Sequence, residues 1–171
     1  MCEEIRIYVA CLASYNNGIL YGAWIDAAQE LEDIQDSVSE MLSKSPVENS
    51  EEYAIHDYEG FCGYYINEYE GLASVCEIAS FIEDQQSLGA ELLSMFGGNV
   101  EEAKQAIDEH YVGHFKSLAD YAQELTEETA QIPEHLKFYI DYEKMARDME
   151  MNGDVYTITT GFHDVYVFWS H

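Results

Sequence analysis

Basic residues are the scarcest class in this sequence. Only 7 residues are Lys or Arg, against 34 Asp and Glu, which gives a formal net charge of -27 over 171 residues. Proteins that bind nucleic acid contact the phosphates with Lys and Arg, so this composition argues against nucleic acid as a partner. It argues equally against docking on an anionic membrane surface, which attracts polybasic segments.

Long apolar runs and cysteine motifs are missing as well. No stretch approaches the roughly 20 apolar residues of a membrane span, and no basic region followed by an apolar run opens the chain. We therefore expect neither a membrane helix nor a signal peptide. The four cysteines, Cys2, Cys11, Cys62 and Cys76, form no C-x-x-C pair. This spacing favours reduced thiols in a cytoplasmic protein over a zinc site or a disulfide framework.

Catalytic motifs are also absent: the chain has no G-x-S-x-G elbow, no P-loop and no H-E-x-x-H. His110 and His114 have the spacing of a metal pair on one helix face, but they lie near a predicted domain boundary, which favours a boundary or surface role. His56 and Asp57 are adjacent in a predicted strand, where they point to opposite faces. We therefore predict a protein without enzymatic activity, cofactor or metal.

Apolar residues are plentiful enough for a folded protein. Hydrophobic residues make up 47% of the chain and aromatic residues 13%, so a core can form in spite of the charge. In residues 1–70, the pattern predicts strands over 5–13 and 19–25, a helix over 26–43 and a strand over 53–58. This first part is expected to be a small α+β domain that opens with a hairpin.

Two further domains are expected. Residues 71–112 read as a helical domain with short loops. Residues 113–171 read as an α+β domain, with a helix near 113–128, a second helix that starts at Pro133 and carries the stripe Leu136 to Met149, and a C-terminal hairpin from 155 to 169. The predicted fold class is α+β, built from three small domains.

The acidic residues are not interspersed with basic ones. Between Lys44 and Lys104 there are thirteen Asp and Glu and no Lys or Arg. Like charges at helical spacing destabilise a helix by a few tenths of a kcal/mol per pair, and interspersed Lys would serve solubility better. Maintaining one sign at an energetic cost therefore suggests that the charge is itself the recognition signal.

The amount and spacing of the charge resemble those of DNA. Acids four residues apart on a helix, such as Asp26 and Glu30 of the predicted helix 26–43, are about 6 Å apart along its axis. That distance is close to the spacing of phosphates along one DNA strand. Drawn as a narrow cylinder, the protein would carry about 60% of the charge of duplex DNA of equal length.

We define the acidic surface as the set of carboxylates predicted to imitate DNA. It comprises Asp26, Glu30, Asp33, Asp36, Glu40, Glu51, Glu52, Asp57, Glu59, Glu68, Glu70, Glu77, Glu83, Asp84, Glu91, Glu101, Glu102, Asp108 and Glu109.

Four segments resemble the ArdA antirestriction proteins of plasmids and conjugative transposons. They are IRIYVACLASYNNGILYGAWID (5–26), EEYAIHDYEGF (51–61), INEY (66–69) and IPEHLKFYIDYEKMARDMEMNGDVYTIT (132–159). The resemblance runs along nearly the whole chain in the same order. It implies a cytoplasmic DNA mimic without enzymatic activity that occupies the DNA-binding groove of the methyltransferase core in type I restriction-modification enzymes. It also implies an elongated chain of three domains whose C-terminal domain forms a homodimer.

The resemblance also places two functional regions. The antirestriction segment would fall near 110–129, with Asp120, Glu124, Glu127 and Glu128 as its acids. Aromatic residues of the C-terminal domain are candidates for the core first and for dimer contacts second: Tyr139, Tyr142, Phe168 and Trp169.

Two alternatives compete with DNA mimicry. One is an acidic adaptor or cation-binding protein with a basic protein partner. The other is the enzyme of a halophile, although Glu outnumbers Asp by 23 to 11 and large aromatics are plentiful, which is not expected of that class.

Overall fold

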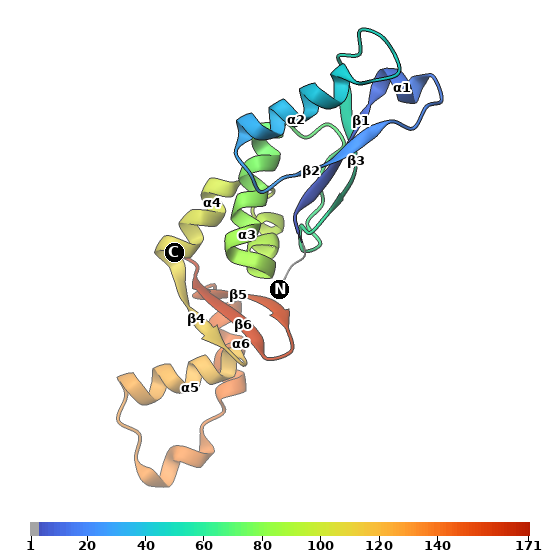
Figure 1. Cartoon of the computed structure of the whole chain (residues 1–171). Coiled ribbons are helices and arrows are strands. Elements are labelled where there is room, and N and C mark those ends of the chain that lie inside the picture. The colour runs from blue at the N-terminus through green and yellow to red at the C-terminus, as the bar shows by residue number, and fades with distance from the viewer. Residues whose placement is uncertain (1–3) are drawn as a thin grey trace. The chain divides into compact units, whose positions relative to one another are not determined.

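The computed structural model describes residues 4–171 and separates the chain into two compact units (Figure 1). Unit 1 is Met1–Val100 and unit 2 is Glu101–His171. The described residues form helices and two three-stranded sheets, one in each unit, which confirms the α+β class. The finer division into three domains stays a prediction.

Unit 1 is built on an antiparallel sheet with strand order β2-β1-β3. Its elements up to the third strand are β1 (Arg6–Cys11), α1 (Leu12–Asn16), β2 (Gly22–Asp26), α2 (Leu31–Ser43) and β3 (Tyr53–Glu59). The predicted opening pair of strands is confirmed, with Tyr8 opposite Trp24. However, the connection between them is not a tight turn, because α1 takes up its first half.

The helix predicted over 26–43 begins only at Leu31. Asp26 belongs to β2, and the Ala27 N–H donates to the Ile5 carbonyl at 2.9 Å, which keeps the backbone extended past the strand. The Asp26 carboxylate then accepts a hydrogen bond from the Ala28 N–H at 2.8 Å and turns the chain. Within α2, the predicted apolar face is confirmed by the burial of Ile34, Val38 and Met41.

The helical region after residue 71 consists of α3 (Leu72–Met95) and α4 (Val100–Gln105). Helix α3 is interrupted at Gln86, whose φ of 56° and ψ of -138° are not helical. Gly97 and Gly98 have positive φ and end the helix, as predicted, and the Gly98 N–H donates to the Leu93 carbonyl at 2.7 Å.

Unit 2 has a second antiparallel sheet, with strand order β4-β6-β5. Its elements after α4 are η1 (Ala106–His110), β4 (Tyr111–Phe115), α5 (Leu118–Thr129), η2 (Glu134–Tyr139), α6 (Tyr142–Met151), β5 (Val155–Gly161) and β6 (Asp164–Trp169). The predicted C-terminal hairpin is confirmed in β5 and β6. Its core joins α5, α6 and the sheet through Leu118, Tyr121, Ala122, Ala146, Val155 and Val167.

Two helix predictions in unit 2 are wrong in part. Residues 111–115 form strand β4, so α5 begins at Leu118, where the Ser117 hydroxyl accepts from the Asp120 N–H at 3.1 Å. The helix expected from Pro133 is interrupted, because Ile140 is extended and the Asp141 carboxylate caps a new helix by accepting from the Lys144 N–H at 3.0 Å.

The cysteine prediction is also wrong in part. Cys62 is disulfide-bonded, whereas Cys11 and Cys76 are free thiols. Cys2 lies outside the described residues.

Two glycines in the loop after β3 provide a matched test of how closely this loop packs against the residues that precede β1. Gly60 and Gly63 both have positive φ, at 82° and 87°. A Cβ on Gly60 would run into the Glu4 carbonyl and lie 2.8 Å from the Ile5 Cα, whereas a Cβ on Gly63 meets nothing within 4 Å.

We predict that Gly63→Ala lowers the free energy of unfolding by about 1 kcal/mol through backbone strain alone. Gly60→Ala should cost about 3 kcal/mol or more, because the backbone of residues 4 and 5, just before β1, must also move. Urea unfolding measures both values. Equal losses in the two variants would contradict the close approach of Gly60 to residues 4 and 5.

Candidate functional site

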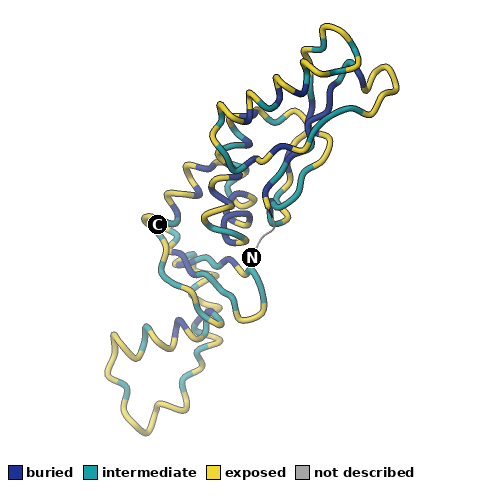
Figure 2. Tube along the Cα trace, viewed as in Figure 1, coloured by how far each residue is buried: buried dark blue, intermediate teal, exposed yellow. Residues whose placement is uncertain are grey.

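The acidic surface is almost entirely accessible to a partner. Of its nineteen carboxylate residues, seventeen are exposed, and only Glu59 and Glu70 are partly buried. Figure 2 shows the wider pattern, in which exposed residues line the outside of both units and buried residues gather inside each one. Folding therefore leaves most of these carboxylates on the surface.

The two basic side chains of unit 1 are each paired with a carboxylate. This unit has nineteen acidic and two basic residues, a formal net charge of -17. The Arg6 Nε donates to the Glu59 Oε1 at 2.6 Å, and the Lys44 Nζ donates to the Glu40 Oε1 at 2.7 Å. The Lys44 hydrogen bond lowers the pKa of Glu40, and the same bond raises the pKa of Lys44. Unit 1 has no other Lys or Arg with which to neutralise its remaining carboxylates.

Helix α2 carries a row of exposed acids on the face opposite its apolar one. Asp33, Asp36 and Glu40 follow i, i+3, i+7 spacing, with axial steps of about 4.5 and 6 Å. Asp26 and Glu30 do not belong to this row, contrary to the sequence-based expectation, because the helix starts after them. Glu30 is the N-cap residue, and its carbonyl accepts from the N–H groups of Asp33 and Ile34.

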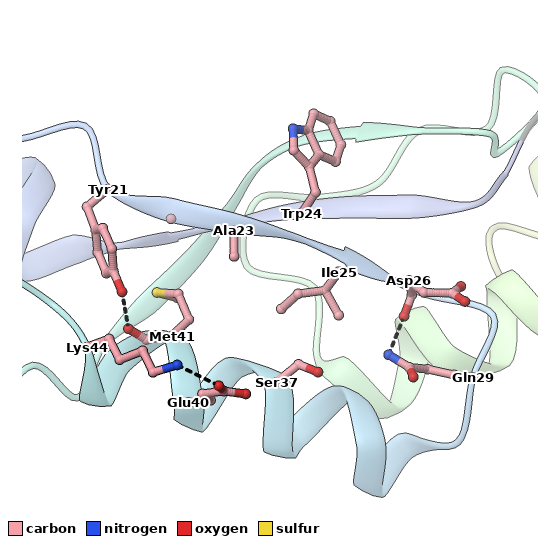
Figure 3. A pocket seen from close by; sticks show the side chains of 11 residues that line it. Tyr21, Ala23, Trp24, Ile25, Asp26, Gln29, Ser37, Glu40, Met41 and Lys44 are labelled. Atoms are coloured by element: carbon pink, nitrogen blue, oxygen red, sulfur yellow. Dashed lines mark hydrogen bonds and ion pairs between the residues drawn. The ribbon is translucent and has the colours of Figure 1, made fainter.

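A cavity of about 350 Å³ lies between β2 and α2 (Figure 3). Its polar groups are joined to each other: the Tyr21 hydroxyl donates to the Met41 carbonyl at 2.7 Å, and Lys44 pairs with Glu40. The Trp24 ring points to the other side of the sheet, away from α2. These contacts hold α2 against the sheet.

The remaining acids of unit 1 lie on or beside β3 and α3. Glu51 and Glu52 precede β3, and Asp57 lies within it. Glu68 is held beside β3 because the Ile55 N–H donates to the Glu68 carbonyl at 2.9 Å. Helix α3 exposes Glu77, Glu83, Asp84 and Glu91 on the sides that its buried residues leave free. Glu101 and Glu102, the first residues of unit 2, lie in the first turn of α4.

In unit 2, the four acids of the predicted antirestriction segment lie on one face of α5. Asp120, Glu124, Glu127 and Glu128 are all exposed and follow i, i+4, i+7, i+8 spacing. The other side of the helix buries Leu118, Tyr121 and Ala122. Asp108 and Glu109 are exposed on η1.

The residues that suggested other chemistry are not brought together. His110 ends η1 and His114 lies in β4, so they do not share a helix face, and the His114 Nε2 instead lies 3.0 Å from the Asp164 Oδ1. Within residues 4–171, no group of three or more His, Cys, Asp and Glu is placed to hold a metal ion. None of the helices in this range is long and apolar enough to span a bilayer.

The aromatic residues considered for dimer contacts differ in position. Phe168 is fully buried within unit 2, where its ring stacks on Tyr156 with centroids 5.2 Å apart, so it serves the core. Tyr139 is 83% exposed and Trp169 is 42% exposed, while Tyr142 packs partly against the core.

A comparison with protein-family models identifies the family. The model described as Antirestriction protein (ArdA) matches residues 7–164. The chain belongs to the ArdA antirestriction family. The match runs through both units of this ArdA chain and includes the acidic face of α5. A search of the curated proteins found no match. Membership in ArdA implies antirestriction, an inhibitory function exerted on restriction-modification enzymes, and ArdA is not a known enzyme family.

The uncompensated charge of unit 1 has a consequence for stability. Raising KCl from about 0.05 to 0.5 M should raise the melting temperature, because salt screens repulsion between exposed carboxylates. The chain should nevertheless remain folded in low salt, where a halophilic enzyme would unfold. Circular dichroism measures both effects.

A variant with three neutral residues on α3, Glu83→Gln, Asp84→Asn and Glu91→Gln, provides the control. Its melting temperature should rise less with salt than that of the unmodified chain. Loss of structure at low salt in the unmodified chain would contradict this account.

Proposed function

We propose that this chain inhibits type I restriction-modification enzymes by occupying their DNA-binding groove as a DNA mimic. One observation carries the proposal: nearly all carboxylates of the acidic surface are exposed, while the two basic residues of unit 1 are already paired. A groove that binds DNA carries Lys and Arg at phosphate spacing, and a surface of one sign complements it.

The spacing of the acids supports this proposal. The acidic face of α5 places four carboxylates within nine residues, about 12 Å of helix axis. The row on α2 has similar steps. Phosphates along one DNA strand have a comparable separation of roughly 7 Å, so several cations of a groove could each meet a carboxylate.

We further propose that the chain acts in the cytoplasm as a homodimer. Each chain would have an elongated form of three domains, which would extend the acidic surface along the groove. The exposed aromatic residues of unit 2, Tyr139, Trp169 and the partly buried Tyr142, are the candidate contacts between copies. Phe168 would support these contacts from within the core.

Restriction and methylation assays test the proposal. Purified chain should block both cleavage and methylation of unmodified DNA at a stoichiometric ratio to the enzyme, since both reactions need the groove. Catalytic inactivation at far lower ratios would contradict mimicry. Capture of basic proteins without any effect on restriction would favour the acidic adaptor instead.

Pooled substitutions locate the charge that matters. Neutralising Asp120, Glu124, Glu127 and Glu128 together to their amides should weaken inhibition roughly tenfold, because several charge contacts of modest strength are lost together. Each single change should cost less than about threefold.

The matched control removes four other acids of unit 2, Glu134, Glu143, Asp148 and Glu150, which lie among Lys137, Lys144 and Arg147 in the sequence. The net charge changes by the same amount, yet inhibition should fall by less than threefold. Equal losses would show that total charge, and not the face of α5, sets the affinity.

A further inference from the structure

Unit 1 has a second cavity, walled by tyrosine rings, that the acidic surface alone does not explain. It measures about 410 Å³ and lies beside β3. Tyr15 and Tyr65 flank the cavity, and their exposed fractions are 52% and 69%. Tyr58 supplies the third ring. The buried side chains of Ile55 and Ile66 complete the apolar part of its lining.

The rings are held by contacts within unit 1. Tyr58 meets Tyr65 edge-on with centroids 6.4 Å apart, and it meets the buried Phe61 in the same way at 5.9 Å. Tyr15 meets the His56 ring edge-on at 4.9 Å. The walls come from α1, β3 and the loop after β3, so the sheet positions the cavity before any partner arrives.

A carboxylate joins the tyrosines at this cavity. The Glu68 Oε1 lies 3.4 Å from the His56 Nε2, and the backbone hydrogen bond from Ile55 to Glu68 fixes this segment along the strand. No Lys or Arg is among the residues that line the cavity. Aromatic faces attract cations through their quadrupole, and an adjacent carboxylate adds to that attraction.

The same combination already binds a cation elsewhere in this chain. The guanidinium carbon of Arg6 lies 4.9 Å from the Trp24 ring centroid, while the same guanidinium pairs with Glu59. In the cavity between β2 and α2, by contrast, Glu40 is paired with Lys44 from within the chain. The tyrosine-walled cavity therefore combines aromatic rings with a carboxylate, as the Arg6 site does, but neither Lys nor Arg lines it, and the Glu68 carboxylate is paired only with the His56 ring among the lining residues.

We infer that the cavity of Tyr15, Tyr58, Tyr65 and Glu68 binds a single cationic side chain, Arg or Lys, of a basic protein partner. Unit 1 has a net charge of -17 and attracts such a surface. The same charge repels the phosphates of a nucleotide, although a base could stack on the rings. The inference rests on the proposed function, because the partner's DNA-binding groove supplies the cation. It adds a fixed anchor point to a surface whose other contacts are distributed.

Charge-neutral variants separate this anchor from DNA mimicry in general. In binding assays of the full chain with a type I methyltransferase core, Tyr65→Ala should weaken affinity about tenfold. Tyr65→Phe keeps the ring and should remain within about twofold. Tyr69→Ala is the matched control, since Tyr69 is equally exposed, at 70%, but does not line the cavity. Its affinity should also remain within twofold.

A probe test does not depend on the enzyme. N-acetyl-arginine methylamide should shift the NMR ring signals of Tyr15, Tyr65 and His56 in the full chain, and Tyr65→Ala should abolish the shift. The citrulline analogue, which has a similar shape without the charge, should cause no shift. Equal shifts with citrulline, or none with arginine, would overturn the inference.

The two tests also keep the proposals apart. If the core binds the chain but Tyr65→Ala binds as well as the unmodified chain, the anchor is wrong and mimicry stands. If the arginine probe binds but the core does not, mimicry fails and the cation site remains.

Discussion

Repulsion between carboxylates is the constraint that the rest of this structure has to meet. With 34 acidic and 7 basic residues, internal ion pairs cannot neutralise the charge, so the acids must stay in water. The helices α2 and α5 are each divided into an apolar and an acidic side. Helix α2 buries Ile34, Val38 and Met41, and α5 buries Leu118, Tyr121 and Ala122. Within residues 4–171, the one buried polar or charged side chain is that of Ser14.

This division shapes the proposed function. A surface made of many exposed carboxylates gives no single residue a decisive part, since each exposed charge contact is weak and screened by salt. Such a surface can attract and orient a basic groove, but it discriminates poorly between basic partners. A fixed cation site such as the tyrosine-walled cavity offers shape in addition to charge, because rings held by the sheet accept one side chain in one place.

Sequence patterns predicted the elements whose signals are local. Strand β1 follows from a β-branched, apolar run, and the apolar face of α2 follows from helical spacing. The exposure of the acids on α2 follows from their place opposite that face. The start of α2 could not be predicted, because the Ala27 N–H is bound by the Ile5 carbonyl from a distant part of the chain. Strand β4 escaped notice because Gly113 and His114 weaken its strand pattern, and it depends on pairing with β6.

The sequence predicted which residues belong to the candidate site better than it predicted how those residues are arranged. The positions of the acids were evident from the sequence, but Asp26 and Glu30 were placed on a helix that starts after them. The four aromatic residues of the C-terminal domain were interpreted as core first, which is right for Phe168 but wrong for the exposed Tyr139 and Trp169. Nothing local, however, indicates that Tyr15, Tyr58 and Tyr65 meet around one cavity. That arrangement depends on α1, β3 and the loop after β3, in which the Glu68 carbonyl accepts from the Ile55 N–H.

The central claim, that this ArdA chain competes with DNA for one groove, is tested most directly by displacement. A fluorescent DNA duplex is bound to a type I methyltransferase core, and the chain is titrated in at several KCl concentrations. The account predicts complete, mutually exclusive displacement, with the affinity of the core for the chain falling as salt rises. A ternary complex of core, duplex and chain, or an affinity for the chain that does not change with salt, would contradict it.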